Sequence, residues 1–144
     1  MTEALALAEG DRVLELGTGS GYQAAILAAM GMDVYTVERI PELYETAQAR
    51  LEALGYAVHC KLADGYEGWP EFAPYDAVIV TAAPPQVPPL LWEQLADEGC
   101  LVIPVGPPHG YQTLWKFVKH GDTIERIDMG GVAFVPFIHP HPAE

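Results

Sequence analysis

The feature that most constrains the fold is a run of three glycines at alternate positions, Glu15-Leu16-Gly17-Thr18-Gly19-Ser20-Gly21. The run follows the β-favouring segment 12–16 and precedes the alanine-rich, helix-favouring segment 22–30. Glycines at such a junction let the backbone turn sharply and approach a ligand closely, and the helix N-terminus offers free N–H groups. The pattern therefore predicts a strand–loop–helix unit that binds the polar end of a small ligand. An ordinary tight turn is the alternative.

Strand-like segments recur along the chain and alternate with helix-like segments. The later predicted strands are 33–37, 58–62, 75–80, 99–105, 111–119, 123–128 and 132–135, and the predicted helices are 22–30, 41–54 and 87–95. Turns at 120–122 and 130–131 separate the last three strands, as expected for antiparallel pairing. We therefore expect an α/β fold in a single domain, 1–144. We expect these eight strand-like segments to form a Rossmann-like, doubly wound sheet of seven strands, mostly parallel with a C-terminal antiparallel hairpin.

Charge and hydropathy exclude several classes of partner. Twenty Asp and Glu against seven Lys and Arg give a formal net charge of −13, which repels nucleic acid and anionic membranes. The sequence contains no apolar run of about 20 residues and no basic leader before an apolar segment. We expect a cytoplasmic monomer with neither a nucleic-acid nor a membrane partner. Cys60 and Cys100 fall on predicted strands too far apart for a disulfide, so both should be reduced thiols.

Three carboxylates in or next to predicted strands suggest the kind of ligand. Glu38 ends the second strand, where it could accept hydrogen bonds from both hydroxyls of a ribose. Asp64 follows the third strand and could accept a bond from an adenine amino group, while Gly65 lets the base lie close. A solvated strand-end charge and an ordinary Asp-Gly turn are the alternatives. Glu15, two places before a G-x-G-x-G run, is typical of seven-strand methyltransferases and differs from the dinucleotide fingerprint.

The segment Gly17-Thr18-Gly19-Ser20-Gly21-Tyr22-Gln23-Ala24-Ala25 closely resembles the cofactor loop of bacterial protein-L-isoaspartate O-methyltransferases. Segments 1–5, 34–38, 64–70, 75–84 and 101–106 resemble the family in the same order. The resemblance implies transfer of methyl from S-adenosyl-L-methionine to the α-carboxylate of L-isoaspartyl residues in damaged proteins, leaving S-adenosyl-L-homocysteine. It implies cofactor contacts from Glu15, Gly17, Thr18, Gly19, Ser20, Gly21, Glu38, Arg39, Asp64, Gly65 and Thr81.

The same resemblance points to the substrate side of the site. It implies substrate-side positions at Ala82, Ala83, Pro84, Gln112, Val135, Pro136 and Ile138, although Ile138 stands where the family usually has threonine. Residues 1–144 contain no match to the T-I-S-x-P-like segment that precedes this region in the family. We therefore expect the chain to bind cofactor and to methylate poorly or not at all, and we assign no catalytic residue. A carboxylate and a sulfonium react without a general base.

Three other interpretations stay open. The chain could methylate another acceptor, bind cofactor with little turnover, or, least in keeping with its motifs, be an NAD-dependent dehydrogenase. Ala82 and Ala83 argue against amine methylation, because amine-directed relatives commonly carry Asp or Asn before the two prolines. His139 and His141 are spaced as a metal pair, but prolines separate them and no third ligand follows, so we expect no metal.

Overall fold

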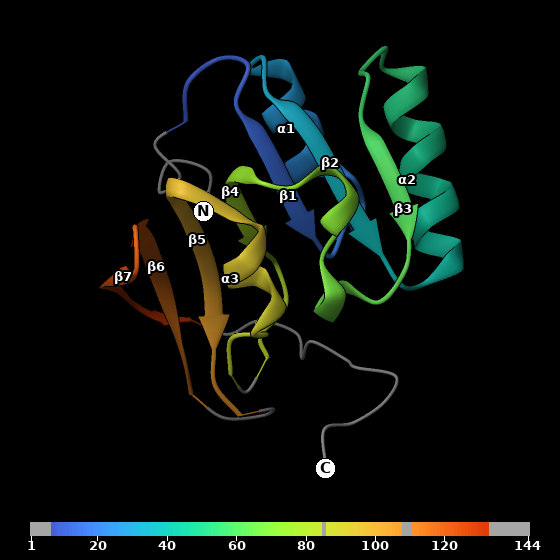
Figure 1. Cartoon of the computed structure of the whole chain (residues 1–144). Coiled ribbons are helices and arrows are strands. Elements are labelled where there is room, and N and C mark those ends of the chain that lie inside the picture. The colour runs from blue at the N-terminus through green and yellow to red at the C-terminus, as the bar shows by residue number, and fades with distance from the viewer. Residues whose placement is uncertain (1–6, 85, 108–110, 133–144) are drawn as a thin grey trace.

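One seven-stranded sheet organises the described residues, which are 7–84, 86–107 and 111–132 of this computed structural model (Figure 1). The strand order is β3-β2-β1-β4-β5-β6-β7, with β1 to β5 parallel and β6 and β7 antiparallel. The strands are β1 Arg12–Leu16, β2 Asp33–Glu38, β3 His59–Leu62, β4 Tyr75–Val80, β5 Leu95–Val105, β6 Gln112–His120 and β7 Thr123–Val132. The predicted fold class is confirmed.

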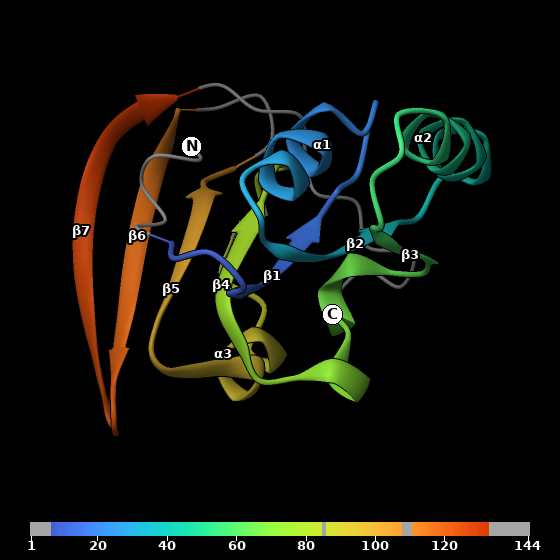
Figure 2. The ribbon, with the colours of Figure 1, turned by 90° about the horizontal axis from the view of Figure 1, so that it is seen from above.

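Helices cover both faces of the sheet, as Figure 2 shows. Helices α1 (Tyr22–Ala29) and α2 (Pro41–Ala53) lie on one face, and α3 (Leu90–Gln94) lies on the other with the 3₁₀ turns η2 (Gly65–Glu67) and η3 (Pro70–Phe72). Alternate strand residues therefore enter different core clusters: Val13 packs in the cluster with α1, and Leu14 packs in the cluster that contains Leu91 of α3. None of the described helices is long and apolar enough to cross a bilayer.

Two boundaries differ from the sequence prediction around the fifth strand. Helix α3 covers Leu90–Gln94 instead of 87–95, and β5 begins at Leu95 instead of residue 99. Pro88 and Pro89 have no backbone N–H, so they can precede the helix but cannot continue its ladder. Leu95 then pairs with Tyr75, and the strand carries an irregularity before Cys100 pairs with Ala77.

The predicted turn at 130–131 is also wrong, because β7 runs unbroken from Thr123 to Val132. Thr113 pairs with Gly131 and Trp115 pairs with Asp128, so two residues of β7 oppose one of β6. Gly130 takes up the extra residue with φ +101°, and its N–H donates to Asp128 Oδ1 at 2.8 Å. The glycine therefore makes a β-bulge instead of a chain reversal. Residues 133–135 of the predicted last strand lie outside the described part.

The cysteine prediction is confirmed. Cys60 on β3 and Cys100 on β5 are both free, and β2, β1 and β4 lie between their strands.

Candidate functional site

The glycine loop between β1 and α1 adopts left-handed backbone conformations at Gly17, Gly19 and Gly21, with φ values of +98°, +55° and +88°. Other residue types rarely adopt them. A Cβ on Gly17 would lie 2.6 Å from Thr81 Oγ1, whereas a Cβ on Gly19 would meet no atom within 4 Å. Packing therefore requires the first glycine, and open space at the second leaves the backbone accessible to a ligand.

Thr81, at the end of β4, holds the beginning of this loop. Its backbone N–H donates to Leu16 O at 3.1 Å. Its hydroxyl donates to Gly17 O at 2.7 Å and lies farther, 3.2 Å, from Leu16 O. The resemblance assigned Thr81 to the cofactor site, and in this structure the Thr81 hydroxyl is bonded to the loop backbone. In this structure Thr81 positions the loop.

Glu38 fastens the middle of the loop to the end of β2. Its Oε1 accepts from Gly19 N–H at 2.9 Å, and its Oε2 accepts from Arg39 and Ile40 N–H at 3.0 and 3.1 Å. The side chain is 6% exposed, so it is not the solvated strand-end charge of the alternative interpretation. A carboxylate accepts about four hydrogen bonds, which leaves roughly one position for a ligand hydroxyl.

Glu15 lies fully buried behind the loop. Its Oε1 is 2.7 Å from Thr36 Oγ1, and Thr36 Oγ1 is 2.6 Å from Thr18 Oγ1, so a line of hydroxyls joins the carboxyl to the loop. Oε2 has no hydrogen-bond partner among the described residues. Burial raises the pKa of Glu15 to about 8; the Thr36 hydrogen bond opposes this shift, and the negative charge of Glu38 adds to it. Glu15 is thus largely protonated at neutral pH.

Asp64 and Gly65 lie beside Glu38 at the end of β3. The Ala63 N–H donates to Glu38 O at 2.9 Å, which joins the two strand ends. Asp64 Oδ1 accepts from Tyr66 N–H at 3.0 Å and begins the 3₁₀ turn η2, while Gly65 is buried. Asp64 thus forms a local turn at this edge of the sheet, beside the end of β2, and its contact with adenine stays a prediction.

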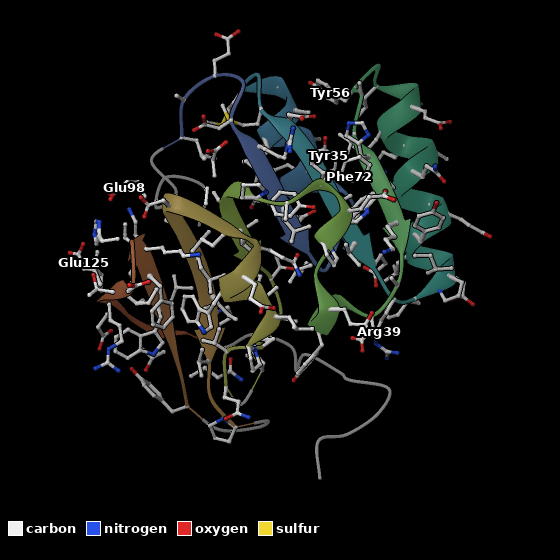
Figure 3. All side chains as sticks on the ribbon, in the orientation of Figure 1. Tyr35, Arg39, Tyr56, Phe72, Glu98 and Glu125 are labelled. Carbon is white, nitrogen blue, oxygen red and sulfur yellow. The ribbon has the colours of Figure 1, made fainter. Side chains whose placement is uncertain are left out.

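The structure brings the predicted cofactor residues to one edge of the sheet, because β1, β2, β3 and β4 are parallel and their carboxyl ends meet there. From β1 the chain continues to β2 and β3 on one side of the sheet, and then to β4 and β5 on the other side. The end of β1 is therefore the switch point where α/β folds bind ligands. Ser20 is exposed, and its carbonyl accepts from Arg50 Nη1 at 2.7 Å. The exposed Arg39 marks this edge in Figure 3, with Tyr56 toward the opposite edge.

The substrate-side residues are described in part. Ala82 follows Thr81, and Ala83 is 3% exposed. Pro84 O accepts from Gly106 N–H at 3.1 Å, which ties this loop to the end of β5. Gln112 begins β6 and is 3% exposed. Val135, Pro136 and Ile138 lie outside the described residues, as do His139 and His141. The described residues hold no group of three His, Cys, Asp or Glu that could bind a metal.

The electrostatics of this edge suit a ligand with positive charge. Two carboxyl groups, Glu15 and Glu38, flank the loop within the sheet, and among the described residues neither forms a salt bridge with Lys, Arg or His. Open space at Gly19 adds room beside these groups. A ligand with a cationic centre and a ribose fits these groups better than one with a chain of phosphates.

Comparison with known families agrees with this geometry. The family described as "Protein-L-isoaspartate(D-aspartate) O-methyltransferase (PCMT)" matches residues 1–141. The chain belongs to this family.

Curated relatives named protein-L-isoaspartate O-methyltransferase are similar over most of the chain. The Dictyoglomus thermophilum protein is 56% identical over 94% of this chain and 62% of its own length, and the Methylorubrum populi protein is 53% identical over 96% and 65%. The Gloeobacter violaceus protein is 47% identical over 100% of this chain and 71% of its own. The chain thus spans less than two thirds of the first two relatives.

Solved structures agree with the fold. A protein-L-isoaspartate O-methyltransferase structure superimposes with a TM-score of 0.88 at 31% identity, over 94% of this chain and 44% of that one. A beta-aspartate methyltransferase from Plasmodium falciparum, in complex with S-adenosyl-L-homocysteine, gives a TM-score of 0.72 at 23% identity, over 90% of this chain and 66% of that one. The second likeness concerns the fold alone.

Thr36, whose hydroxyl joins Glu15 to the glycine loop, was not predicted as a site residue. The sequence offers one signal, because Thr36 is a small polar residue in an otherwise β-favouring segment, 33–37. Parallel pairing places it directly beside Glu15. Register between neighbouring strands was needed to recognise the pair.

Proposed function

We propose that this chain binds S-adenosyl-L-methionine and transfers its methyl group to the α-carboxylate of L-isoaspartyl residues in damaged proteins. The observation that carries the proposal is the glycine loop fastened by Glu38 and backed by Glu15 at the switch point of the sheet. Membership of the family supplies the substrate class. The relatives that carry this activity in their names are longer than this chain.

When bound, S-adenosyl-L-methionine would supply an activated methyl group, which a carboxylate oxygen takes as the carbon–sulfur bond breaks and sulfur keeps the electron pair. The isoaspartyl α-carboxylate is ionised at neutral pH, so the protein needs no general base. The protein's own contribution is then to orient the reactants and to exclude water.

The residues at the edge divide this task among them. Gly19 presents open backbone, Glu38 would accept from a ribose hydroxyl, and Asp64 would accept from the adenine amino group. Ala82 and Ala83 would form an apolar wall on the methyl side, which favours a carboxylate acceptor over an amine that must lose a proton. Gln112 would face the same side.

The test separates binding from turnover. Calorimetry measures the affinity of the 144-residue chain for S-adenosyl-L-homocysteine, and labelled cofactor measures methyl transfer to an isoaspartyl peptide and to its aspartyl isomer. Transfer to the first peptide alone supports the proposal. Binding without transfer to either peptide favours a cofactor-binding core, transfer to a different acceptor favours another methyltransferase, and absence of binding overturns the cofactor assignment.

A second version of the chain, extended by a family-type N-terminal segment, tests the expectation that this segment forms part of the substrate site. The extended version should bind the cofactor equally well and turn over faster. Equal turnover by both would show that the segment is dispensable. We further propose that the protein acts as a cytoplasmic monomer on isoaspartyl peptides and proteins. Its net charge of −13 disfavours nucleic acid and anionic membranes as partners.

A further inference from the structure

The carboxyl group of Glu15 is in an unusual position for an ionisable side chain. It is completely buried, its Oε1 is bonded to a hydroxyl, and its Oε2 is bonded to no described residue. A buried carboxylate is stable only where a positive charge or several hydrogen bonds compensate it. The described part of the chain gives Glu15 no cationic partner, so the ligand-free protein stabilises the neutral form.

The surroundings of Glu15 carry few other charges. Glu38 at the end of β2 is negative and favours a neutral Glu15, and the half-buried Cys60 thiol on β3 lies in the same row across the sheet, beside Thr36. Ile79 is its neighbour on β4, and α1 carries no charged side chain. On α2, Arg50 donates to the Ser20 carbonyl and Glu52 acts on Cys60.

A hydroxyl line joins this buried group to the site. Thr36 lies 2.7 Å from Glu15 Oε1 and 2.6 Å from Thr18, which belongs to the glycine loop and is 6% exposed. Each hydroxyl has one hydrogen to donate. If Glu15 is ionised, Thr18 donates to Thr36 and Thr36 donates to Glu15. If Glu15 carries a proton on Oε1, both hydrogen bonds can reverse, so that Glu15 donates to Thr36 and Thr36 donates to Thr18. The two hydroxyls can therefore relay a proton between the buried carboxyl and the loop.

Resting on the function proposed above, we infer that Glu15 is a proton-linked specificity residue that ionises when the cationic methyl donor binds. The donor and its product share the adenosine, amino and carboxyl groups and differ by one positive charge at sulfur. A positive centre beside the loop stabilises the ionised carboxyl, whereas the neutral thioether does not. The leaving proton passes along Thr36 and Thr18 to solvent. The site therefore favours the donor over the product, which assists product release.

Because the pKa of Glu15 is raised to about 8 in the free protein, donor binding near pH 7.5 must release a fraction of a proton. If the donor lowers that pKa by about one unit, the ratio of donor affinity to product affinity rises about tenfold between acidic and alkaline pH. The amino group of each ligand also titrates in this pH range. Because both ligands carry it, its effect cancels in the ratio of the two affinities.

The experiment is calorimetry in two buffers that differ in ionisation enthalpy, which counts protons released on binding. Wild-type protein should release protons with S-adenosyl-L-methionine and fewer with S-adenosyl-L-homocysteine, and the affinity ratio should rise with pH. Glu15→Gln should abolish the excess release and flatten the ratio. Glu45→Gln, on the exposed face of α2, is the matched control and should behave as wild type.

Two further variants separate this role from a merely structural one. Thr36→Val removes the hydrogen bond that favours the ionised form, so it should move the midpoint of the affinity ratio to higher pH. Cys60→Ala should keep the excess release, because the thiol is not the proton source. The decisive comparison uses the wild type alone. If it releases equal numbers of protons with both ligands, the inference is overturned and the proposed function is left intact. Absence of binding by either ligand would overturn both.

Discussion

Replacing Glu38 with alanine should weaken cofactor binding and loosen the glycine loop together. The carboxylate accepts three backbone N–H groups and is 6% exposed. Arg39 and Ile40 lie in exposed positions where water can replace the lost acceptor, whereas Gly19 is half-buried and its N–H points to Glu38. We therefore expect a stability loss of about 1–2 kcal/mol, from about one poorly replaced hydrogen bond.

The effect on binding adds the lost contact with the ribose. A charge-assisted hydrogen bond contributes about 1.5–3 kcal/mol, so the dissociation constant for S-adenosyl-L-homocysteine should rise about 10- to 150-fold. Calorimetry measures this change, and urea unfolding measures the stability. Glu45→Ala, an exposed substitution on α2, is the control and should leave both unchanged.

A ligand that lacks one ribose hydroxyl distinguishes the two effects. Loss of this hydroxyl should weaken binding to the wild type about tenfold. In Glu38→Ala the same loss should matter much less, because the carboxylate that accepts from the hydroxyl is already absent. Equal losses in both proteins would mean that Glu38 organises the loop without touching the ribose. Wild-type affinity in a folded Glu38→Ala protein would refute the reasoning altogether.

Three other predictions test the rest of the site. Asp64→Leu should weaken the binding of S-adenosyl-L-homocysteine about tenfold, as measured by calorimetry. If the wild type binds S-adenosyl-L-homocysteine and an analogue with hydrogen in place of the adenine amino group equally well, Asp64 does not contact that amino group. Gly17→Ala should lower the free energy of unfolding by about 1–3 kcal/mol in urea, because φ is +98° and the new Cβ would lie 2.6 Å from Thr81 Oγ1; an unchanged midpoint would contradict this. The pKa of Glu15 is raised in the folded state from 4.5 to about 8. The stability that the protonated Glu15 contributes is therefore fully present below pH 4.5 and is lost as the pH rises to 8. Glu15→Gln should therefore gain stability relative to wild type across that window, and parallel pH profiles in thermal unfolding would argue against a buried neutral carboxyl.

Much of the site could be located from sequence because it depends on local rules. Alternate glycines between a β-favouring and a helix-favouring segment specify the loop, and the parallel connectivity of β1, β2 and β3 places Glu38 and Asp64 at the same edge. The adjoining antiparallel strands were also recognisable from their alternation. The end of β7 was misjudged, because a glycine with positive φ can make a turn or a bulge, and only pairing with β6 decides between them.

Only the tertiary structure decided how the carboxylates are used. Glu15 and Thr36 are 21 positions apart, and they meet because β1 and β2 pair with these residues opposite one another. Burial then withdraws water from Glu15 and raises its pKa, whereas Glu38, in reach of three backbone N–H groups, becomes the anchor of the loop. Sequence shows which residues carry charge. Solvation and strand register are properties of the packed chain, and they determine what each charge does.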